Sequence, residues 1–134
     1  MKVTVKQILE LQVEIVGAKS DNLKITGLLN EKLNMKTKFW LQELLKKVAE
    51  KKESYAEVEK SLFVSLGAVE EESGLVIPFT LEDGSDNPAI KALDVEREKL
   101  LNEEVDLGEF KFNINDFDFE SESNYYTFMS VAFE

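Results

Sequence analysis

The chain has 134 residues, which is room for one domain with one core. Hydrophobic residues make up 43% and charged residues 32%, a composition typical of a soluble globular protein and not of a disordered or lipid-embedded one. The sequence has no Cys and no His, which excludes thiol and Ser-His nucleophiles, Cys/His zinc or haem sites and disulfide bonds.

The net charge of -11 is divided unevenly along the chain. Residues 1–60 hold 12 Lys against 9 acidic residues, a net +3, whereas residues 61–134 hold 4 basic and 18 acidic residues, a net -14. Nucleic-acid phosphates and anionic lipids repel such an acidic part, so we expect no direct nucleic-acid or membrane partner. We predict a single domain over 1–134, with a helical, mildly basic part (1–67) and an acidic part (68–134) that contains a helix and a β-hairpin.

No segment of the sequence has the pattern of a targeting signal or a membrane anchor. The longest apolar stretches, such as residues 75–79, fall well short of the roughly 18 residues that a spanning helix needs. The first residues lack the apolar region of a signal peptide. We therefore expect the protein in a cytoplasm, or in a particle assembled there.

The first segment, residues 5–16, fits two patterns. Thr4 and Gln7 have capping-box spacing, and apolar residues recur at helical intervals, whereas Leu11, Val13 and Ile15 alternate with polar residues as in a strand. We favour a helix that ends at Gly17. Residues 17–22 then read as a loop, and residues 23–33 as a turn or a helix broken at Gly27.

The clearest pattern is a long amphipathic helix from about 35 to 66. Its apolar positions step by three and four, and they are Leu41, Leu44, Leu45, Val48, Tyr55, Val58, Leu62 and Leu66. Gly67 supplies the stop. A helix of about 32 residues extends roughly 48 Å, longer than a globule of this size, so part of it must protrude, bend or meet a partner.

The region after this helix predicts a loop, an edge strand and a second helix. Residues 68–74 read as an acidic loop, and residues 75–81 as an edge strand because Pro78 lacks the ladder N–H. Asn87 before Pro88 places an N-cap ahead of a helix that runs to about residue 104. Asp83, Ser85, Asn87 and Asp94 approximate a calcium loop, but a turn that caps this helix explains the same residues.

From residue 105 onward the apolar period changes from 3.6 to 2. Phe110, Phe112 and Ile114 alternate with polar residues, and a β-bulge near Asn115 would bring Phe117 and Phe119 into the same pattern. Residues 121–124 form a turn, and residues 125–133 read as a return strand. The predicted fold class is α+β, with the long amphipathic helix and a second helix packed with a C-terminal antiparallel β-hairpin or small sheet.

Two groups of residues are candidate partner contacts. An extended strand would put Asp116, Asp118, Glu120 and Glu122 on one face, either as a solvent-facing edge or, less in keeping with the pattern, as oxygen ligands for Mg²⁺ or Ca²⁺. Phe39 and Trp40 lie about 100° apart on the long helix, so they cannot both enter one seam; a core or half-buried role is favoured, with an interface anchor as the alternative. The six glycines have no dinucleotide- or phosphate-binding spacing, and we predict no cofactor.

The order of features resembles a family of small acidic proteins encoded by bacteriophages of Gram-positive hosts. The resemblance rests on a short apolar N-terminal element, on Asn-Glu-Lys-Leu-Asn-Met at 30–35 leading into the Lys/Glu helix, and on Glu-Lys-Leu-Leu-Asn-Glu-Glu-Val-Asp-Leu at 98–107. It covers most of residues 23–120, and residues 125–134 depart from it. The resemblance implies a phage origin and a binding or assembly role, with no accepted activity and no site residues.

These features lead to three functional hypotheses. The first is a non-enzymatic phage protein that acts by protein–protein contacts in virion assembly or on a host factor, with head-to-tail self-association permitted by the opposite charges of its two parts. The second is an acidic inhibitor that imitates nucleic acid, because carboxylates at about 6.6 Å intervals on a strand resemble phosphate spacing. The third is a metal-dependent hydrolase that uses the carboxylates of 116–122.

Overall fold

The computed structural model describes residues 1–133, without the side chain of Leu23, and the chain divides into two compact units. Unit 1 comprises Met1–Lys52 and the segment from Glu104 to the C-terminus, and unit 2 comprises Glu53–Glu103. The long helix contributes residues to both units. The boundaries therefore differ from the expected division at residue 67, and whether the chain folds as a single domain stays a prediction.

Unit 1 begins with a short strand and a capped helix. Helix α1 spans Val5–Val16, and its capping box is complete: Gln7 N donates to Thr4 Oγ1 (3.2 Å) while Thr4 N donates to Gln7 Oε1 (2.9 Å). Gly17 ends the helix with φ +95°. The structure thus confirms the helical interpretation of residues 5–16 over the strand.

Strand β1 (Lys2–Thr4) pairs with β6 (Glu104–Asp106) in a two-stranded antiparallel sheet, with Val3 opposite Val105. The backbone continues this pairing, because Leu107 N donates to Met1 O (2.9 Å) and the terminal ammonium of Met1 donates to Gly108 O (2.6 Å). The sequence pattern did not indicate either strand.

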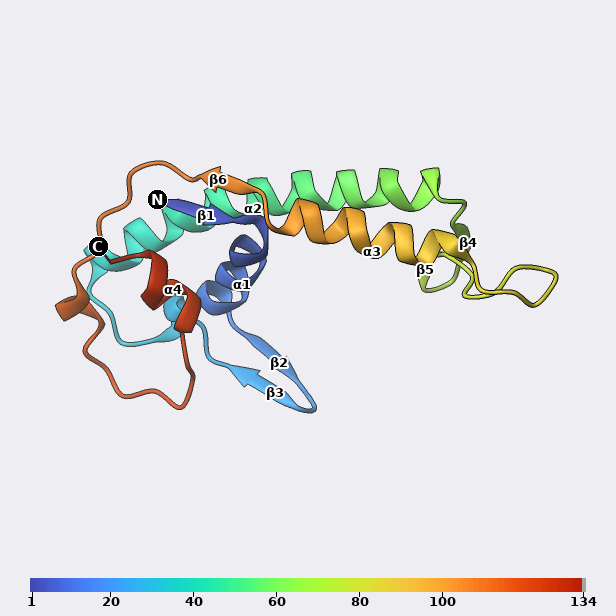
Figure 1. The fold of residues 1–134 in the computed structure, drawn as a ribbon. Coiled ribbons are helices and arrows are strands. Elements are labelled where there is room, and N and C mark those ends of the chain that lie inside the picture. Colours follow the sequence, from blue (N-terminus) through green and yellow to red (C-terminus); the bar gives the residue numbers. More distant parts are fainter. Residues whose placement is uncertain (134) are drawn as a thin grey trace. The chain divides into compact units, whose positions relative to one another are not determined.

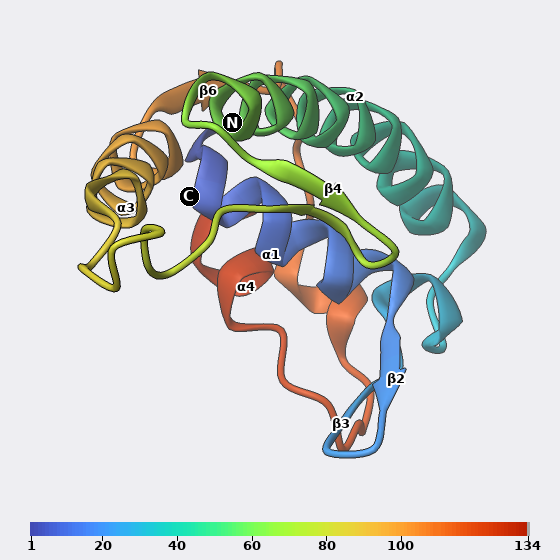
Figure 2. The same cartoon turned by 90° about the vertical axis from the view of Figure 1, so that its right-hand side faces the viewer.

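A hairpin joins β2 (Ala18–Ser20) to β3 (Leu23–Ile25) and projects from the end of α1 (Figure 2). The expectations of a loop over 17–22 and a broken helix over 23–33 are therefore wrong in part: two strands lie there, followed by the 3-10 helix η1 (Leu28–Asn30). Two strands of three residues each, joined by a two-residue turn, are too short for a periodic pattern to identify.

The hairpin is fixed at its base by two glycines in close approach. Gly17 and Gly27 both have positive φ, at +95° and +93°. A Cβ on Gly17 would lie 2.5 Å from Thr26 O, and one on Gly27 would lie 2.5 Å from the carbonyl group of Val16. Only glycine fits at these two positions, because the atoms that a Cβ would meet belong to the backbone.

Helix α2 (Met35–Ser65) confirms the long helix and covers the core of unit 1 with its first half. Leu41, Leu44 and Val48 are completely buried against Ile8, Leu11 and Ile15 of α1 in one hydrophobic cluster. Asn34 caps the helix, since Thr37 N donates to Asn34 Oδ1 (2.8 Å). The three-and-four spacing of its apolar residues therefore identifies a core face over residues 41–48.

The C-terminal segment of unit 1 is not a β-hairpin. Residues 114–117 form the 3-10 helix η2 (Ile114–Phe117) and residues 126–131 form helix α4 (Tyr126–Val131), so the strands expected over 110–119 and 125–133 and the bulge near Asn115 are wrong. The alternating aromatic residues instead come together from irregular chain: the rings of Phe112, Phe117 and Phe133 surround the fully buried Phe128, with centroid separations of 5.1–5.8 Å. Tertiary packing has overridden the local strand pattern.

Unit 2 consists of the end of α2, a small hairpin and helix α3, which runs back in the opposite direction to α2 (Figure 1). Strands β4 (Val69–Glu71) and β5 (Gly74–Val76) replace the acidic loop expected over 68–74, and the strand expected over 75–81 is limited to β5 and an isolated bridge between Thr80 and Asp86. Helix α3 (Pro88–Leu101) has the predicted caps: Asn87 Oδ1 accepts from Ala89 N (3.0 Å), and Pro88 is its first residue.

The structure confirms the α+β class, with the long helix, a second helix and small antiparallel sheets. Of the two alternatives for the C-terminal part, a small sheet forms through β6, while the C-terminal hairpin is replaced by η2 and α4. Among residues 1–133, none of the helices is both long and apolar enough to cross a membrane.

Candidate functional site

Phe39 and Trp40 lie together at the surface of the first half of α2. Phe39 is 55% exposed and Trp40 is 42% exposed, and their rings form an edge-to-face pair with centroids 5.2 Å apart. The next residue, Leu41, is completely buried, because it lies about 100° further around the helix than Trp40 and faces the core. Neither ring is in the core; both are half-buried, and the interface-anchor alternative stays a prediction.

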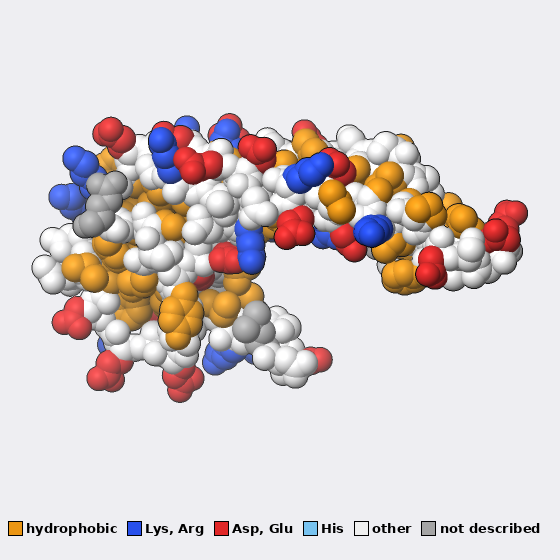
Figure 3. All heavy atoms as spheres, in the orientation of Figure 1, with side chains coloured by type: hydrophobic (Ala, Val, Ile, Leu, Met, Phe, Trp, Pro, Cys, Tyr) orange, Lys and Arg blue, Asp and Glu red, His pale blue; other side chains and the backbone are white. Residues whose placement is uncertain are grey.

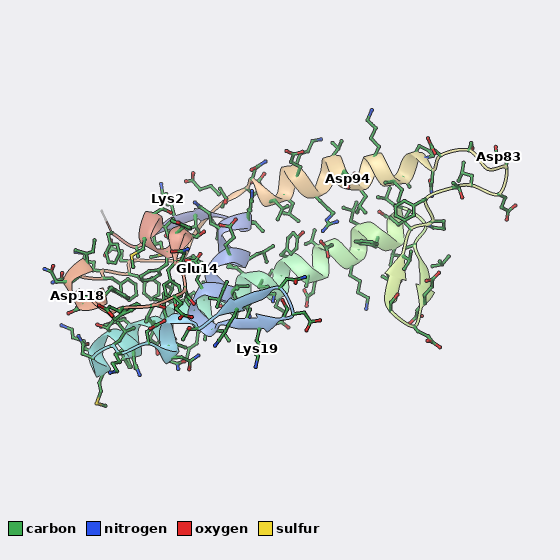
Figure 4. The ribbon with its side chains drawn as sticks, turned by 90° about the horizontal axis from the view of Figure 1, so that it is seen from below. Lys2, Glu14, Lys19, Asp83, Asp94 and Asp118 are labelled. Carbon is green, nitrogen blue, oxygen red and sulfur yellow. The ribbon has the colours of Figure 1, made fainter. Side chains whose placement is uncertain are left out.

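The four carboxylates expected on one strand face are exposed but do not share a face. Asp116 belongs to η2 and Asp118 caps its C-terminal end, at the outer side of this turn in Figure 4. Glu120 and Glu122 instead line a polar pocket of about 330 Å³ together with Lys24 and Glu31. Within residues 1–133, no group of three or more acidic side chains is arranged to hold a metal ion.

A network of hydrogen bonds joins the rim of this polar pocket. Glu31 Oε1 accepts from the hydroxyls of Ser121 (2.6 Å) and Tyr125 (2.8 Å), while Ser123 Oγ accepts from the backbone N–H of Thr26 (2.9 Å). Burial, and then the bond to Glu31, raises the pKa of Tyr125 above its ordinary value. The network ties residues 121–125 to Thr26, just after β3, and to Glu31, just after η1, and this structural role needs no ligand.

Glu14 is a buried acid of α1 that caps α4. Its Oε1 accepts from Phe128 N (2.9 Å) and its Oε2 from Thr127 N (3.2 Å), so one carboxylate satisfies two amides at the start of the helix (Figure 4). Glu10 adds a hydrogen bond from the hydroxyl of Thr127. Tyr125, at the N-cap position, makes no side-chain capping bond. Glu14 is therefore satisfied structurally and is not a free catalytic carboxylate.

A groove of about 830 Å³ follows the β1–β6 sheet of unit 1. Its walls combine backbone and polar groups of residues 1–2, 106 and 108–111 with apolar side chains of Phe110, Phe112 and residues 131–133. Asp106 on its edge has a pKa lowered by the backbone N–H of Gly108 and by the nearby terminal ammonium of Met1. These interactions fix the terminus against the sheet, and the described lining brings no nucleophile and base together.

Unit 2 buries few of its hydrophobic side chains. Only Ile77 and Leu93 are buried among Glu53–Glu103. Its exposed large hydrophobic side chains belong to α2, α3, β4 and the loop after β5, and Figure 3 shows hydrophobic side chains next to acidic ones on the visible face of unit 2. We call this set the unit 2 apolar surface; it comprises Val58, Val64, Val69, Phe79, Leu81 and Val95.

The two helices of unit 2 are joined by a polar contact. Arg97 Nε lies 3.2 Å from Glu59 Oε2, which also accepts a hydrogen bond from the hydroxyl of Tyr55 (2.7 Å). Burial and this hydrogen bond raise the pKa of Tyr55. Next to it, a shallow groove of about 400 Å³ is lined by α2 and the β4–β5 hairpin, including Phe63 and Leu75. The contact between α2 and α3 is therefore partly polar. Two helices that are stable as a pair by themselves would bury an apolar seam between them.

The residues of the unit 2 loop do not form a cation site. Figure 4 places Asp83 in the loop and Asp94 along α3, separated within the unit. Asp83 accepts from the backbone N–H of Ser85 (2.9 Å) and from its hydroxyl, which lowers the pKa of Asp83. Asn87 caps α3. The structure thus confirms the capping interpretation of this segment.

Sequence reasoning found Phe39 and Trp40 as candidate contacts but missed the unit 2 apolar surface. The signal available was charge: residues 53–103 hold 13 acidic and 4 basic residues, a net -9, so unit 2 carries most of the chain's net charge of -11. Comparisons with protein-family models, with curated proteins and with solved structures found no match to this chain.

Proposed function

We propose that this chain is a non-enzymatic interaction or assembly protein that binds a protein partner through the unit 2 apolar surface. The resemblance to phage proteins supports a role in virion assembly or on a host factor, in the host cytoplasm or in the virion. The absence of Cys and His from the sequence supports a role without thiol, Ser-His or imidazole chemistry.

One observation carries this proposal: the apolar stripe of α2 is completely buried in unit 1 and only partly buried in unit 2. Leu41, Leu44 and Val48 have no exposed surface, whereas Val58, ten residues beyond Val48 on the same stripe, is 53% exposed and the other stripe residues of unit 2 are partly buried. Val64, on a different side of the helix, is 60% exposed. An amphipathic helix that extends past its own core is typical of a surface that another chain covers.

The energetics favour a partner. Covering the exposed half of a Val or Leu side chain contributes on the order of 1 kcal/mol, so the five exposed Val and Leu side chains together with Phe79 contribute several kcal/mol toward the cost of protein association. The acidic residues around them would form a polar rim that selects a basic partner surface.

Site-specific photo-crosslinking in the producing cell tests the proposal. A photoreactive residue at Val64 or Val95 is expected to give a discrete crosslinked band that contains this chain and one protein partner. The matched control is the same residue at Lys19, an exposed position on β2. Equal, diffuse labelling from all three positions would overturn the proposal.

A second candidate is an acidic inhibitor that imitates nucleic acid, and the -9 charge of unit 2 favours it. The regular carboxylate ladder expected over 116–122 does not support it, because these residues do not form a strand. Competition distinguishes the candidates. Duplex DNA that prevents formation of the crosslink supports the inhibitor, whereas a crosslink that forms equally well in the presence of DNA supports the apolar docking.

A further inference from the structure

We propose that the partner of the unit 2 apolar surface is a second copy of this chain, which docks through the exposed face of the first half of α2. This inference rests on the proposed function and names the occupant of the same surface. We call the docking face the α2 aromatic–lysine face; it comprises Lys36, Phe39, Trp40 and Lys47.

These four residues share one side of the helix. Their spacing of i, i+3, i+4 and i+11 places them within about 100° around the helix axis. The buried residues Leu41, Leu44 and Val48 occupy a neighbouring side, centred about 120° away around the axis, so the α2 aromatic–lysine face lies outside the core of unit 1.

The charges of the two surfaces are complementary. Residues 32–52 hold 7 Lys and 2 Glu, a net +5, whereas unit 2 has a net -9. Opposite charge raises the rate of encounter and fixes the orientation of a complex. The overall charge of -11 makes two copies repel at a distance, but this repulsion is screened beyond roughly 8 Å at physiological salt, while a local contact between opposite charges persists.

The apolar groups are complementary as well. Phe39 and Trp40 form a preformed aromatic pair, and aromatic residues are enriched among the anchors of protein interfaces. The unit 2 apolar surface offers aliphatic side chains and the exposed ring of Phe79, which is 78% exposed. The α2 aromatic–lysine face is basic and aromatic, and the unit 2 apolar surface is acidic and largely aliphatic. The two surfaces are therefore complementary in charge and in polarity.

The contact joins two different surfaces, so it is heterologous. Such a contact leaves one unused surface at each end of a dimer, and further copies add until a ring closes or a filament forms. This property separates the proposal from a two-fold dimer, in which each surface would meet its own copy.

Complementation between two variants tests the proposal. The α2-face variant carries Phe39→Ala, Trp40→Ala and Lys47→Glu, and the unit 2 variant carries Val64→Lys and Val95→Lys. All five side chains are exposed, so both variants should keep the far-UV circular dichroism of the natural chain. The control variant carries Lys19→Glu and Lys24→Glu, two charge reversals on the β2–β3 hairpin.

Light scattering after size exclusion is expected to show oligomers for the natural chain and for the control variant. Each of the other variants alone should be monomeric, or associate at least about tenfold more weakly. An equal mixture of these two variants should form a dimer and nothing larger, because only one intact pair of surfaces remains.

Three results would overturn the proposal: a natural chain that is monomeric throughout, a variant that still dimerises alone, or a mixture that stays monomeric. A monomeric natural chain that still crosslinks from Val64 or Val95 to a different protein would refute self-association and leave the proposed function standing. Monomeric behaviour without specific crosslinks would refute both.

Discussion

Glu14 and Phe128 are 114 residues apart in the chain, and a hydrogen bond of 2.9 Å from the amide of Phe128 to the carboxylate of Glu14 joins them in the interior of unit 1. The same carboxylate accepts from Thr127 N. A helix of six residues is too short to persist by itself, so α4 depends on this contact from α1 and on the burial of Phe128. The cap that a local side chain supplies in most helices comes here from a distant element.

Replacement of Glu14 by Gln should destabilise unit 1 by about 1–3 kcal/mol, because an amide cannot accept at both of its terminal atoms and one buried N–H would lose its partner. Urea unfolding followed by circular dichroism measures the change. Glu122→Gln, at an exposed position, serves as the control and should change stability by less than about 0.5 kcal/mol. Equal effects of the two substitutions would show that Glu14 does not act as a cap.

Replacement of Gly27 by Ala should cost about 3 kcal/mol or more, because a Cβ at this position meets the backbone of Val16 at 2.5 Å in addition to the strain of a positive φ. Gly108→Ala is the matched control in the same unit. Gly108 has a similar φ of +100°, but its Cβ would meet only the ring of Phe110 at 3.9 Å. The control should therefore lose only about 1–2 kcal/mol. Thermal unfolding that ranks Gly108→Ala as the more damaging change would contradict the close approach.

Tyr125 should contribute to a loss of stability in alkali. Burial and the bond to Glu31 raise its pKa in the folded state, so its contribution is complete below the unfolded value near 10 and is lost as pH rises through the folded value. The ultraviolet absorbance of tyrosinate, compared with that of a Tyr125→Phe variant, measures this ionisation. Glu31→Gln should shift it to lower pH, and no shift would show that the hydrogen bond to Glu31 does not act on Tyr125.

Trp40 is the chain's only tryptophan, so its fluorescence reports on the α2 aromatic–lysine face. At 42% exposure, its emission in a dilute sample should be red-shifted and readily quenched by acrylamide. Association should shift the emission to the blue and reduce quenching, because docking removes water from the indole. The unit 2 variant should show no such change with concentration. A blue shift in that variant would mean that Trp40 is covered by something other than unit 2.

The helices of this fold were predictable where local signals were complete. Thr4 and Gln7 form the expected capping box, and Asn87 and Pro88 start α3 as expected. Long periodic segments bury enough of one face for the pattern to decide the structure, as Leu41, Leu44 and Val48 do in α2. In these elements the local preference and the tertiary contacts agree.

The C-terminal segment was not predictable in the same way, because its local preference and its tertiary contacts disagree. The aromatic residues of 125–133 favour a strand, yet Tyr125, Phe128 and Ala132 are the buried residues and are spaced by three and four. That spacing was the signal for α4, and it was masked by the preceding alternation of phenylalanines. The deciding contact, Glu14 on the start of α4, cannot be read from sequence order.

The candidate site was predictable only in part. Exposure of Phe39 and Trp40 depends on which face of α2 meets α1. From the sequence alone, one can infer only that the two rings cannot both enter one seam. Of the residues of the unit 2 apolar surface, Val58 belongs to the expected apolar stripe. Which part of a stripe is covered depends on the length of the core, and periodicity carries no information on that length.

Amide hydrogen exchange tests the central claim, that unit 2 needs a partner to bury its hydrophobic side chains, most directly. In a dilute sample, the amides of residues 88–101 should exchange much faster than those of residues 41–48, because Leu93 alone is buried in α3 while three α2 side chains are completely buried. Raising the protein concentration should slow exchange in unit 2. Protection of α3 equal to that of residues 41–48 at every concentration would contradict the claim, since unit 2 would then be stable without a partner.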